Sequence, residues 1–143
     1  MLGLLVLLVL TLRVCWTDGR YRHISNWLVM AVAITVIVIN GFSHPPWSSL
    51  GLLTLATGVL YAAGIMAGGD AKLILAYFCG ISSSLWLDVF VVMAMLGGLL
   101  AFISLAYGGL HRDLAGVRRR GIPYGIAIGL SGMLGVIAST VTV

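Results

Sequence analysis

Charged residues are scarce in this sequence, and glutamate is missing altogether. Only 8% of the 143 residues are charged, whereas a soluble domain usually carries about 25%. Hydrophobic residues make up 61% of the chain, and the mean hydropathy is +1.14. One core cannot bury so many apolar side chains in a chain of this length, so lipid must cover the rest. The composition therefore predicts an integral membrane protein and excludes an ordinary soluble domain.

Cysteine is scarce, with two residues, and the histidines do not form a cluster. Cys15 and Cys79 lie far apart inside apolar runs, and His23 and His44 have no metal-ligand companions. Neither a zinc site nor a disulfide framework is therefore predicted, and the two cysteines are interpreted as small packing residues. The first residues lack a basic segment and a small-residue cleavage site, so Met1–Leu12 is interpreted as a retained helix and not as a removed signal peptide.

Long apolar runs fill most of the chain, and short breaks of charged or turn-forming residues separate them. They predict an all-α, polytopic membrane protein with about six transmembrane helices, in a single domain over residues 1–143. Within the last run, Gly121, Gly125 and Gly129 form a row of small residues that predicts a close helix–helix contact. The expected spans are Leu2–Trp16, Trp27–Phe42, Ser49–Met66, Leu73–Leu87, Val89–Tyr107 and Ile122–Thr142.

The basic residues occur in alternate breaks, and this sets the expected orientation. After Arg13 in the first run, the breaks following spans one, three and five hold Arg20, Arg22, Lys72, Arg112, Arg118, Arg119 and Arg120. The other breaks contain neither Lys nor Arg, so the positive-inside rule places the basic breaks in the cytoplasm and both termini outside. Short basic breaks suit anionic lipid headgroups, and they do not form the basic face that nucleic-acid binding requires.

Two aspartates lie at the cytoplasmic ends of predicted spans. Asp18 directly follows the first apolar run, and Asp70 closes the segment Ala67–Asp70. Ionisable groups at membrane depth are costly, so a carboxyl group at each of two helix–loop junctions on one face indicates a functional site. Two carboxyl groups that share a proton can activate a water molecule and protonate a peptide carbonyl, as peptide hydrolysis requires. Asp88 is expected on the outer side, and Asp113 in an arginine-rich cytoplasmic break.

The residues around this pair are candidates for substrate binding or for shaping the loop. Gly68 and Gly69 allow unusual backbone dihedrals and close approach of a substrate, with a simple turn as the alternative. Lys72 either orients the loop or polarises the substrate, and a snorkelling lysine that sets the topology is the favoured alternative. Asn26 either holds the loop by hydrogen bonds or caps the second span. The alternative for Asp18 is an interfacial carboxylate paired with a nearby arginine.

The segments Asp18–Asn26 and Ala67–Leu73 resemble the two active-site motifs of the type IV prepilin peptidase family, which are membrane aspartyl proteases of the GxGD type. Ile122–Ile128 resembles a further family pattern near the last span. The resemblance covers essentially the whole chain and is best to the short members that serve Flp-type (tight-adherence) pili. Ala67 replaces the first glycine of the GxGD motif and Ser25 replaces a usual proline, and neither change removes a catalytic group.

The resemblance implies that Asp18 and Asp70 are the catalytic aspartates. It also implies that the substrate is a Flp-like prepilin whose short basic leader is removed after a glycine, at the cytoplasmic face of the bacterial inner membrane. Larger members carry paired CxxC motifs and also N-methylate the new N-terminus. Because this sequence has no such motif, we expect cleavage without methylation and without a metal or other cofactor.

Two alternatives to a protease remain open on the sequence. The protein could be a non-enzymatic membrane assembly or transport subunit whose carboxylates bind ions or relay protons. A relay needs acids spread through the membrane depth, whereas Asp18 and Asp70 are predicted near one face, so hydrolysis is favoured. The changes at Ala67 and Ser25 leave room for an inactive scaffold that keeps the fold. The sequence does not indicate an oligomeric state.

Overall fold

The computed structural model describes residues 1–40, 47–110 and 121–142. For residue 142 it describes the backbone only. Within these residues the regular structure is helical and no strand occurs, so the prediction of an all-α fold is confirmed. The elements in chain order are α1 (Leu2–Tyr21), α2 (Asn26–Asn40), α3 (Trp47–Ala62), α4 (Gly68–Phe78), the short 3-10 helix η1 (Ser83–Leu85), α5 (Trp86–Leu110) and α7 (Tyr124–Thr142).

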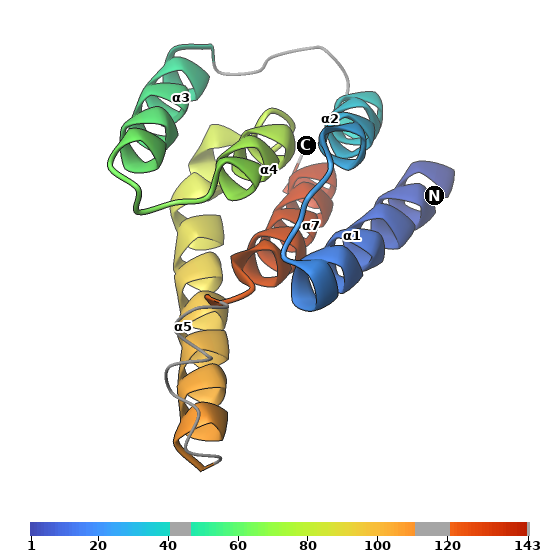
Figure 1. Cartoon of the computed structure of the whole chain (residues 1–143). Coiled ribbons are helices and arrows are strands. Elements are labelled where there is room, and N and C mark those ends of the chain that lie inside the picture. The colour runs from blue at the N-terminus through green and yellow to red at the C-terminus, as the bar shows by residue number, and fades with distance from the viewer. Residues whose placement is uncertain (41–46, 111–120, 143) are drawn as a thin grey trace.

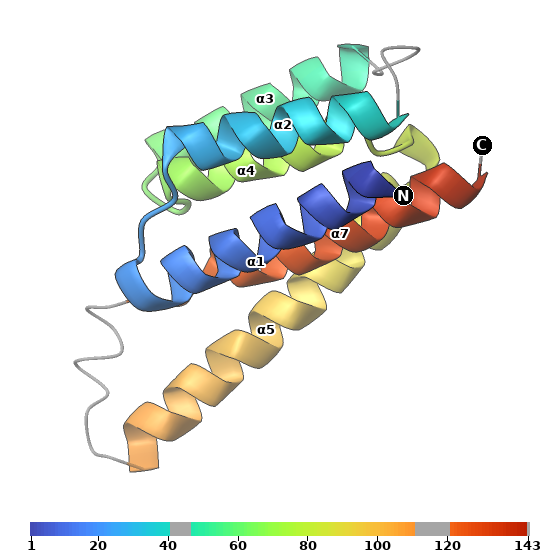
Figure 2. The same ribbon diagram turned by 90° about the vertical axis from the view of Figure 1, so that its right-hand side faces the viewer.

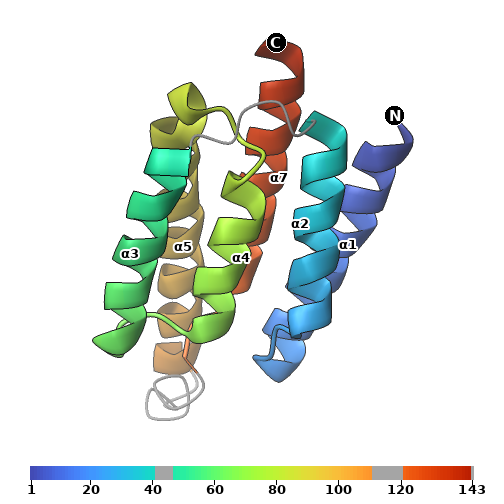
Figure 3. The ribbon, with the colours of Figure 1, turned by 90° about the horizontal axis from the view of Figure 1, so that it is seen from above.

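The α-helices form two layers (Figure 1). One layer contains α3, α4 and α2 side by side, and the other contains α5, α7 and α1. Figure 3 shows α4 between α3 and α2 in the first layer. α7 is the middle helix of the second layer and packs directly on α4. Because each of the other α-helices contacts α4 or α7, these two helices organise the core.

The core lies where α4 packs against α7. Tyr77 of α4 is fully buried, and its hydroxyl oxygen lies 2.7 Å from that of Thr11 on α1. Glycines let α7 approach its neighbours closely: a Cβ at Gly132 would lie 2.4 Å from Cγ of Tyr77, and a Cβ at Gly135 would lie 2.6 Å from Cγ2 of Val89. Larger residues at these positions would push α7 away from α4 and α5.

The predicted row of small residues on the last span is only partly a helix contact. Gly125 and Gly129 both face α1, where a Cβ at Gly129 would lie 3.3 Å from Cγ2 of Thr11. The prediction is wrong for Gly121, which precedes α7 and has a φ of 70°. A positive φ is readily adopted by glycine, so Gly121 is a turn residue that leads into the helix.

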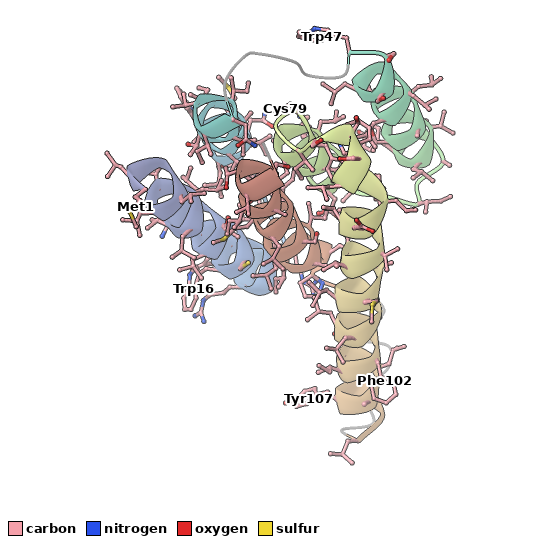
Figure 4. All side chains as sticks on the ribbon, turned by 180° about the vertical axis from the view of Figure 1, so that it is seen from behind. Met1, Trp16, Trp47, Cys79, Phe102 and Tyr107 are labelled. Atoms are coloured by element: carbon pink, nitrogen blue, oxygen red, sulfur yellow. The ribbon has the colours of Figure 1, made fainter. Side chains whose placement is uncertain are left out.

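Three helical segments are long and apolar enough to cross a membrane, namely Leu2–Tyr21, Ser83–Leu110 and Tyr124–Val141. α2 and α3 are apolar but shorter, with 15 and 16 residues. Large apolar side chains cover the outside of the bundle, and Figure 4 shows Phe102 projecting from α5 away from the other helices. Such a surface belongs in lipid. The prediction of a polytopic membrane protein is confirmed, although three spans and not six have full length.

The predicted fourth span, Leu73–Leu87, is wrong as a continuous helix. α4 ends at Phe78 after 11 residues, and a turn leads through η1 into α5. Non-helical backbone at membrane depth needs hydrogen-bond partners from the protein. Side chains from three helices supply them: Asn40 Nδ2 donates to the Gly80 carbonyl, Ser139 Oγ accepts from the Ser82 N–H at 3.0 Å, and Trp86 Nε1 donates to the Ile81 carbonyl at 3.0 Å.

Candidate active site

Asp18 and Asp70 lie at the same end of the bundle, here called the aspartate end. It is formed by the last turns of α1 and the first turns of α2, α4 and α7, and both chain termini lie at the opposite end (Figure 2). The predicted loop position of Asp18 is wrong, because α1 continues to Tyr21 and includes it. Asp70 likewise lies within the first turn of α4 and not in the preceding loop.

Asp18 is held by the beginning of α7. It is only 6% exposed, although it carries a carboxyl group. Its Oδ2 accepts a hydrogen bond from the Gly125 N–H at 2.8 Å. The first N–H groups of a helix have no acceptor within the helix, so Asp18 supplies one. The positive end of the α7 dipole also favours a carboxylate at this position.

Gly125 and Gly69 both lie close to Ile24, and Gly125 also lies close to Asp18. A Cβ at Gly125 would lie 2.8 Å from Asp18 Oδ2 and 2.9 Å from Ile24 Cδ1. A Cβ at Gly69 would lie 3.3 Å from the Cβ of Ile24. Ile24 is on the segment that links α1 to α2, and it contacts the first turns of both α4 and α7. It therefore helps to fix the separation of the helix ends that form the aspartate end.

Asp70 is half-buried and interacts electrostatically with Asp18. Burial raises the pKa of Asp70 to about 6, the negative charge of Asp18 acts in the same direction, and the positive charge of Arg22 opposes both. A carboxyl group that resists ionisation beside a second carboxyl group is the arrangement in which two acids share one proton. Among the residues that the structure describes, no hydrogen-bond donor contacts the Asp70 carboxyl group.

Arg22 ends α1 and brings a positive charge to both acids. Its φ of 53° lies in the left-handed region, and its N–H donates to the Asp18 carbonyl at 3.1 Å. A single left-handed residue of this kind is a common helix C-cap, although it is usually a glycine. The Arg22 charge acts on Asp18 and Asp70 together, which makes a negative charge at the aspartate end less unfavourable.

The predicted loop residues lie beside the pair. Lys72 Nζ donates a hydrogen bond to Asn26 Oδ1 at 3.1 Å, which joins α4 to α2 at an exposed position. The cap of α2 is made by Ser25, whose Oγ accepts from an N–H of the first turn at 3.3 Å, so Asn26 is not the capping residue. A Cβ at Gly68 would lie 3.1 Å from Cε2 of Tyr61, so this glycine lets α4 start close to the end of α3.

Asp88 lies apart from this pair of aspartates. Asp88 is in the first turn of α5, near the turn that bonds to the C-terminal part of α7, and thus at the end opposite to the aspartates. Asp113 and the three arginines of residues 118–120 lie outside the described residues. Within the described part of the chain, no group of three His, Cys, Asp or Glu side chains could hold a metal ion.

Two residues that shape the site, Gly125 and Ile24, were not predicted to belong to it. A signal for Gly125 was present, because Pro123 just before an apolar run marks a helix start. A helix that starts at the membrane face predicted for Asp18 points its free N–H groups toward that face. Ile24 gives no comparable signal, since a single isoleucine in a polar linker is ordinary.

The comparison with known proteins identifies the family. A family model described as the type IV leader peptidase family matches residues 5–103, which is more than half of the chain. The match contains both aspartates and Ile24, whereas Gly125 and α7 lie outside it. Neither a curated protein nor a solved structure matches the chain significantly. The protein therefore belongs to the type IV leader peptidase family, as the resemblance of its two aspartate segments predicted.

Proposed function

We propose that this protein is a membrane-embedded aspartic endopeptidase that removes the short basic leader of Flp-like prepilins. The observation that carries this proposal is the pairing of Asp18 and Asp70 at one end of the bundle, where α1 and α4 each bring one carboxyl group and the two interact. Membership of a leader peptidase family supports a proteolytic function. A proton relay is less well supported, since both acids lie at the same end and not along the membrane depth.

The pair can perform peptide hydrolysis with one carboxyl group ionised and the other protonated. The ionised carboxylate takes a proton from water as the water oxygen bonds to the scissile carbonyl carbon, and the protonated carboxyl group gives its proton to the carbonyl oxygen. The first acid then protonates the amide nitrogen as the C–N bond breaks, and the second recovers a proton from the diol. One water molecule is consumed, and both acids return to their initial states.

The surroundings of the pair suit a substrate with a polar leader and an apolar helix. The aspartate end lies beside apolar helices that face lipid, so an apolar segment could remain in the membrane while its leader reaches the acids. The basic breaks of the sequence favour a cytoplasmic aspartate end in the bacterial inner membrane. The resemblance to the short Flp-type members supports a Flp-like prepilin, cleavage after a glycine, and no N-methylation of the product.

Co-expression with a tagged, candidate Flp-like prepilin tests the proposal. The wild type, Asp18→Asn and Asp70→Asn are compared at equal membrane levels, and the size shift and the new N-terminus of the pilin are read by mass spectrometry. Asp88→Asn is the matched control, because it changes an aspartate at the opposite end. We expect cleavage by the wild type and the control alone, with an unmethylated product. Cleavage by both site variants would overturn the proposal.

A further inference from the structure

We propose that Gly125 is a positioning residue of the active site, whose N–H fixes Asp18 as the ionised general base and leaves Asp70 to supply the proton. The inference rests on the proposed function, because it assigns roles within the same pair of acids. Two carboxyl groups that share a proton are interchangeable in principle. What separates them here is the set of groups around each carboxyl group.

Burial disfavours a negative charge on Asp18, but a backbone N–H group and the charge of Arg22 oppose this effect, so Asp18 ionises more readily than Asp70. An amide N–H can only donate a hydrogen bond, so the Asp18 oxygen bonded to Gly125 at 2.8 Å must act as an acceptor. Asp18 lies near the C-terminal end of α1, where the dipole of its own helix disfavours a negative charge. The Gly125 N–H at the start of α7 and the charge of Arg22 counteract that effect. The titratable or charged groups acting on or near Asp18 are Arg22 and Cys15 on α1 and Asp70 on α4.

The surroundings of Asp70 favour its protonated form. Its position in the first turn of α4 favours a negative charge, but its burial and the charge of Asp18 have the opposite and larger effect. Within the described chain, Asp70 has no counterpart of the Gly125 N–H. With Asp18 ionised, the shared proton therefore resides on Asp70. Asp18 then accepts the proton of the attacking water, and Asp70 donates to the carbonyl oxygen of the substrate.

Position 125 has a specific need for glycine. A Cβ there would lie 2.8 Å from Oδ2 and 2.9 Å from Cγ of Asp18, which is closer than real Cβ contacts allow. An alanine must therefore displace the carboxyl group whose orientation the Gly125 N–H defines. The same Cβ would meet Cδ1 of Ile24 at 2.9 Å, so a structural clash and a displaced Asp18 must be separated by experiment.

The test is the pH dependence of kcat/KM for the purified full-length protein in lipid vesicles, with a synthetic prepilin peptide as substrate. Removing donors to the ionised form of Asp18 makes its proton harder to lose, so the acid limb of the profile should move to higher pH. For Gly125→Ala we expect a shift of about one pH unit, equal to a tenfold change in proton affinity. We also expect a fall in kcat of tenfold or more, with little change in KM. Gly58→Ala is the control, because a Cβ at Gly58 meets nothing within 4 Å.

A double variant keeps the inference falsifiable if Gly125→Ala folds poorly. Ile24→Val lacks the Cδ1 atom that the new Cβ would meet, but it leaves the contact with Asp18 unchanged. We expect Ile24→Val/Gly125→Ala to insert normally and still show the displaced acid limb. A wild-type rate in the double variant, or a uniform loss of rate with no shift of the limb, would overturn the inference. Wild-type protein that cleaves no prepilin at any pH would instead overturn the proposed function.

Discussion

At the residue scale, Asp18 has a structural role beside the catalytic role that we propose for it. Its buried carboxyl group accepts a hydrogen bond from the Gly125 N–H at the start of α7. A buried donor that loses its acceptor destabilises a protein by about 1–3 kcal/mol. An amide side chain of the same shape keeps an acceptor oxygen, whereas alanine keeps none.

We therefore predict that Asp18→Asn abolishes cleavage but retains most of the stability. Asp18→Ala should abolish cleavage and also lower the free energy of unfolding by about 1–3 kcal/mol. Denaturant unfolding in detergent, followed by tryptophan fluorescence, compares the two variants. Equal stability of both would show that the contact of Asp18 with α7 contributes nothing to folding.

Asp70 gives a prediction for the pH dependence of the reaction. With a pKa of about 6, Asp70 loses its proton above that pH, and the pair then has two carboxylates and no acid. The alkaline limb of kcat/KM should therefore fall near pH 6 and not near the ordinary value of 3.8. In Asp18→Asn the pKa of Asp70 should decrease, which carboxyl infrared difference spectra of the two proteins can measure. An unchanged pKa would contradict an electrostatic interaction between the acids.

The same shift links pH to stability. The folded protein holds the Asp70 proton more tightly than the unfolded chain does. The contribution of this group to the free energy of unfolding is therefore largest below about pH 4. It is lost as the pH rises through about 6. The unfolding midpoint of the wild type should decrease over this range more than that of Asp70→Asn.

At the element scale, the close packing of α4 on α7 depends on a glycine, Gly132, at the contact. A Cβ at Gly132 would lie 2.4 Å from the ring of the fully buried Tyr77. We predict that Gly132→Ala lowers the free energy of unfolding by about 1–3 kcal/mol through overpacking. Gly98→Ala in α5 is the matched control, because its Cβ meets nothing within 4 Å and helix propensity favours alanine. A smaller loss in Gly132→Ala than in the control would contradict the packing shown here.

The contact between α2 and α4 through Lys72 is exposed, so its effect should be small. Lys72→Met keeps the stem of the side chain but removes the hydrogen bond to Asn26. We expect cleavage to fall by less than about fivefold, since exposed polar pairs contribute roughly 0–1 kcal/mol. A loss of a hundredfold or more in kcat would instead favour direct polarisation of the substrate by Lys72.

Helices could be predicted from the sequence because apolar runs in lipid must satisfy their backbone internally. Their ends could not always be predicted, since these depend on distant partners. α4 stops at Phe78 where Asn40 and Ser139 bond to the following turn, and neither is near it in sequence. The two aspartates could be predicted as site residues from the cost of burying a charge and from their position, but the hydrogen bond from the Gly125 N–H of α7 required the packed structure.

At the scale of the whole molecule, the orientation of the bundle can be tested directly. Asn26 is exposed at the aspartate end, and Trp47 is exposed at the opposite end. In a background where Cys15 and Cys79 are replaced by alanine, Asn26→Cys should react with a membrane-impermeant maleimide only after cells are permeabilised. Trp47→Cys should react in spheroplasts that are still intact. The reverse pattern would place the aspartates on the outer face and exclude cytoplasmic cleavage.

The hydrogen bond from Gly125 to Asp18 also orders events during biosynthesis. Both aspartates leave the ribosome before α7 does, and the intervening residues take roughly several seconds to translate. Until α7 inserts and packs, Asp18 has no helix start to hold its carboxylate. Under the proposed function, the nascent chain thus carries both acids before its active site is assembled, and the packing of α7 completes that site.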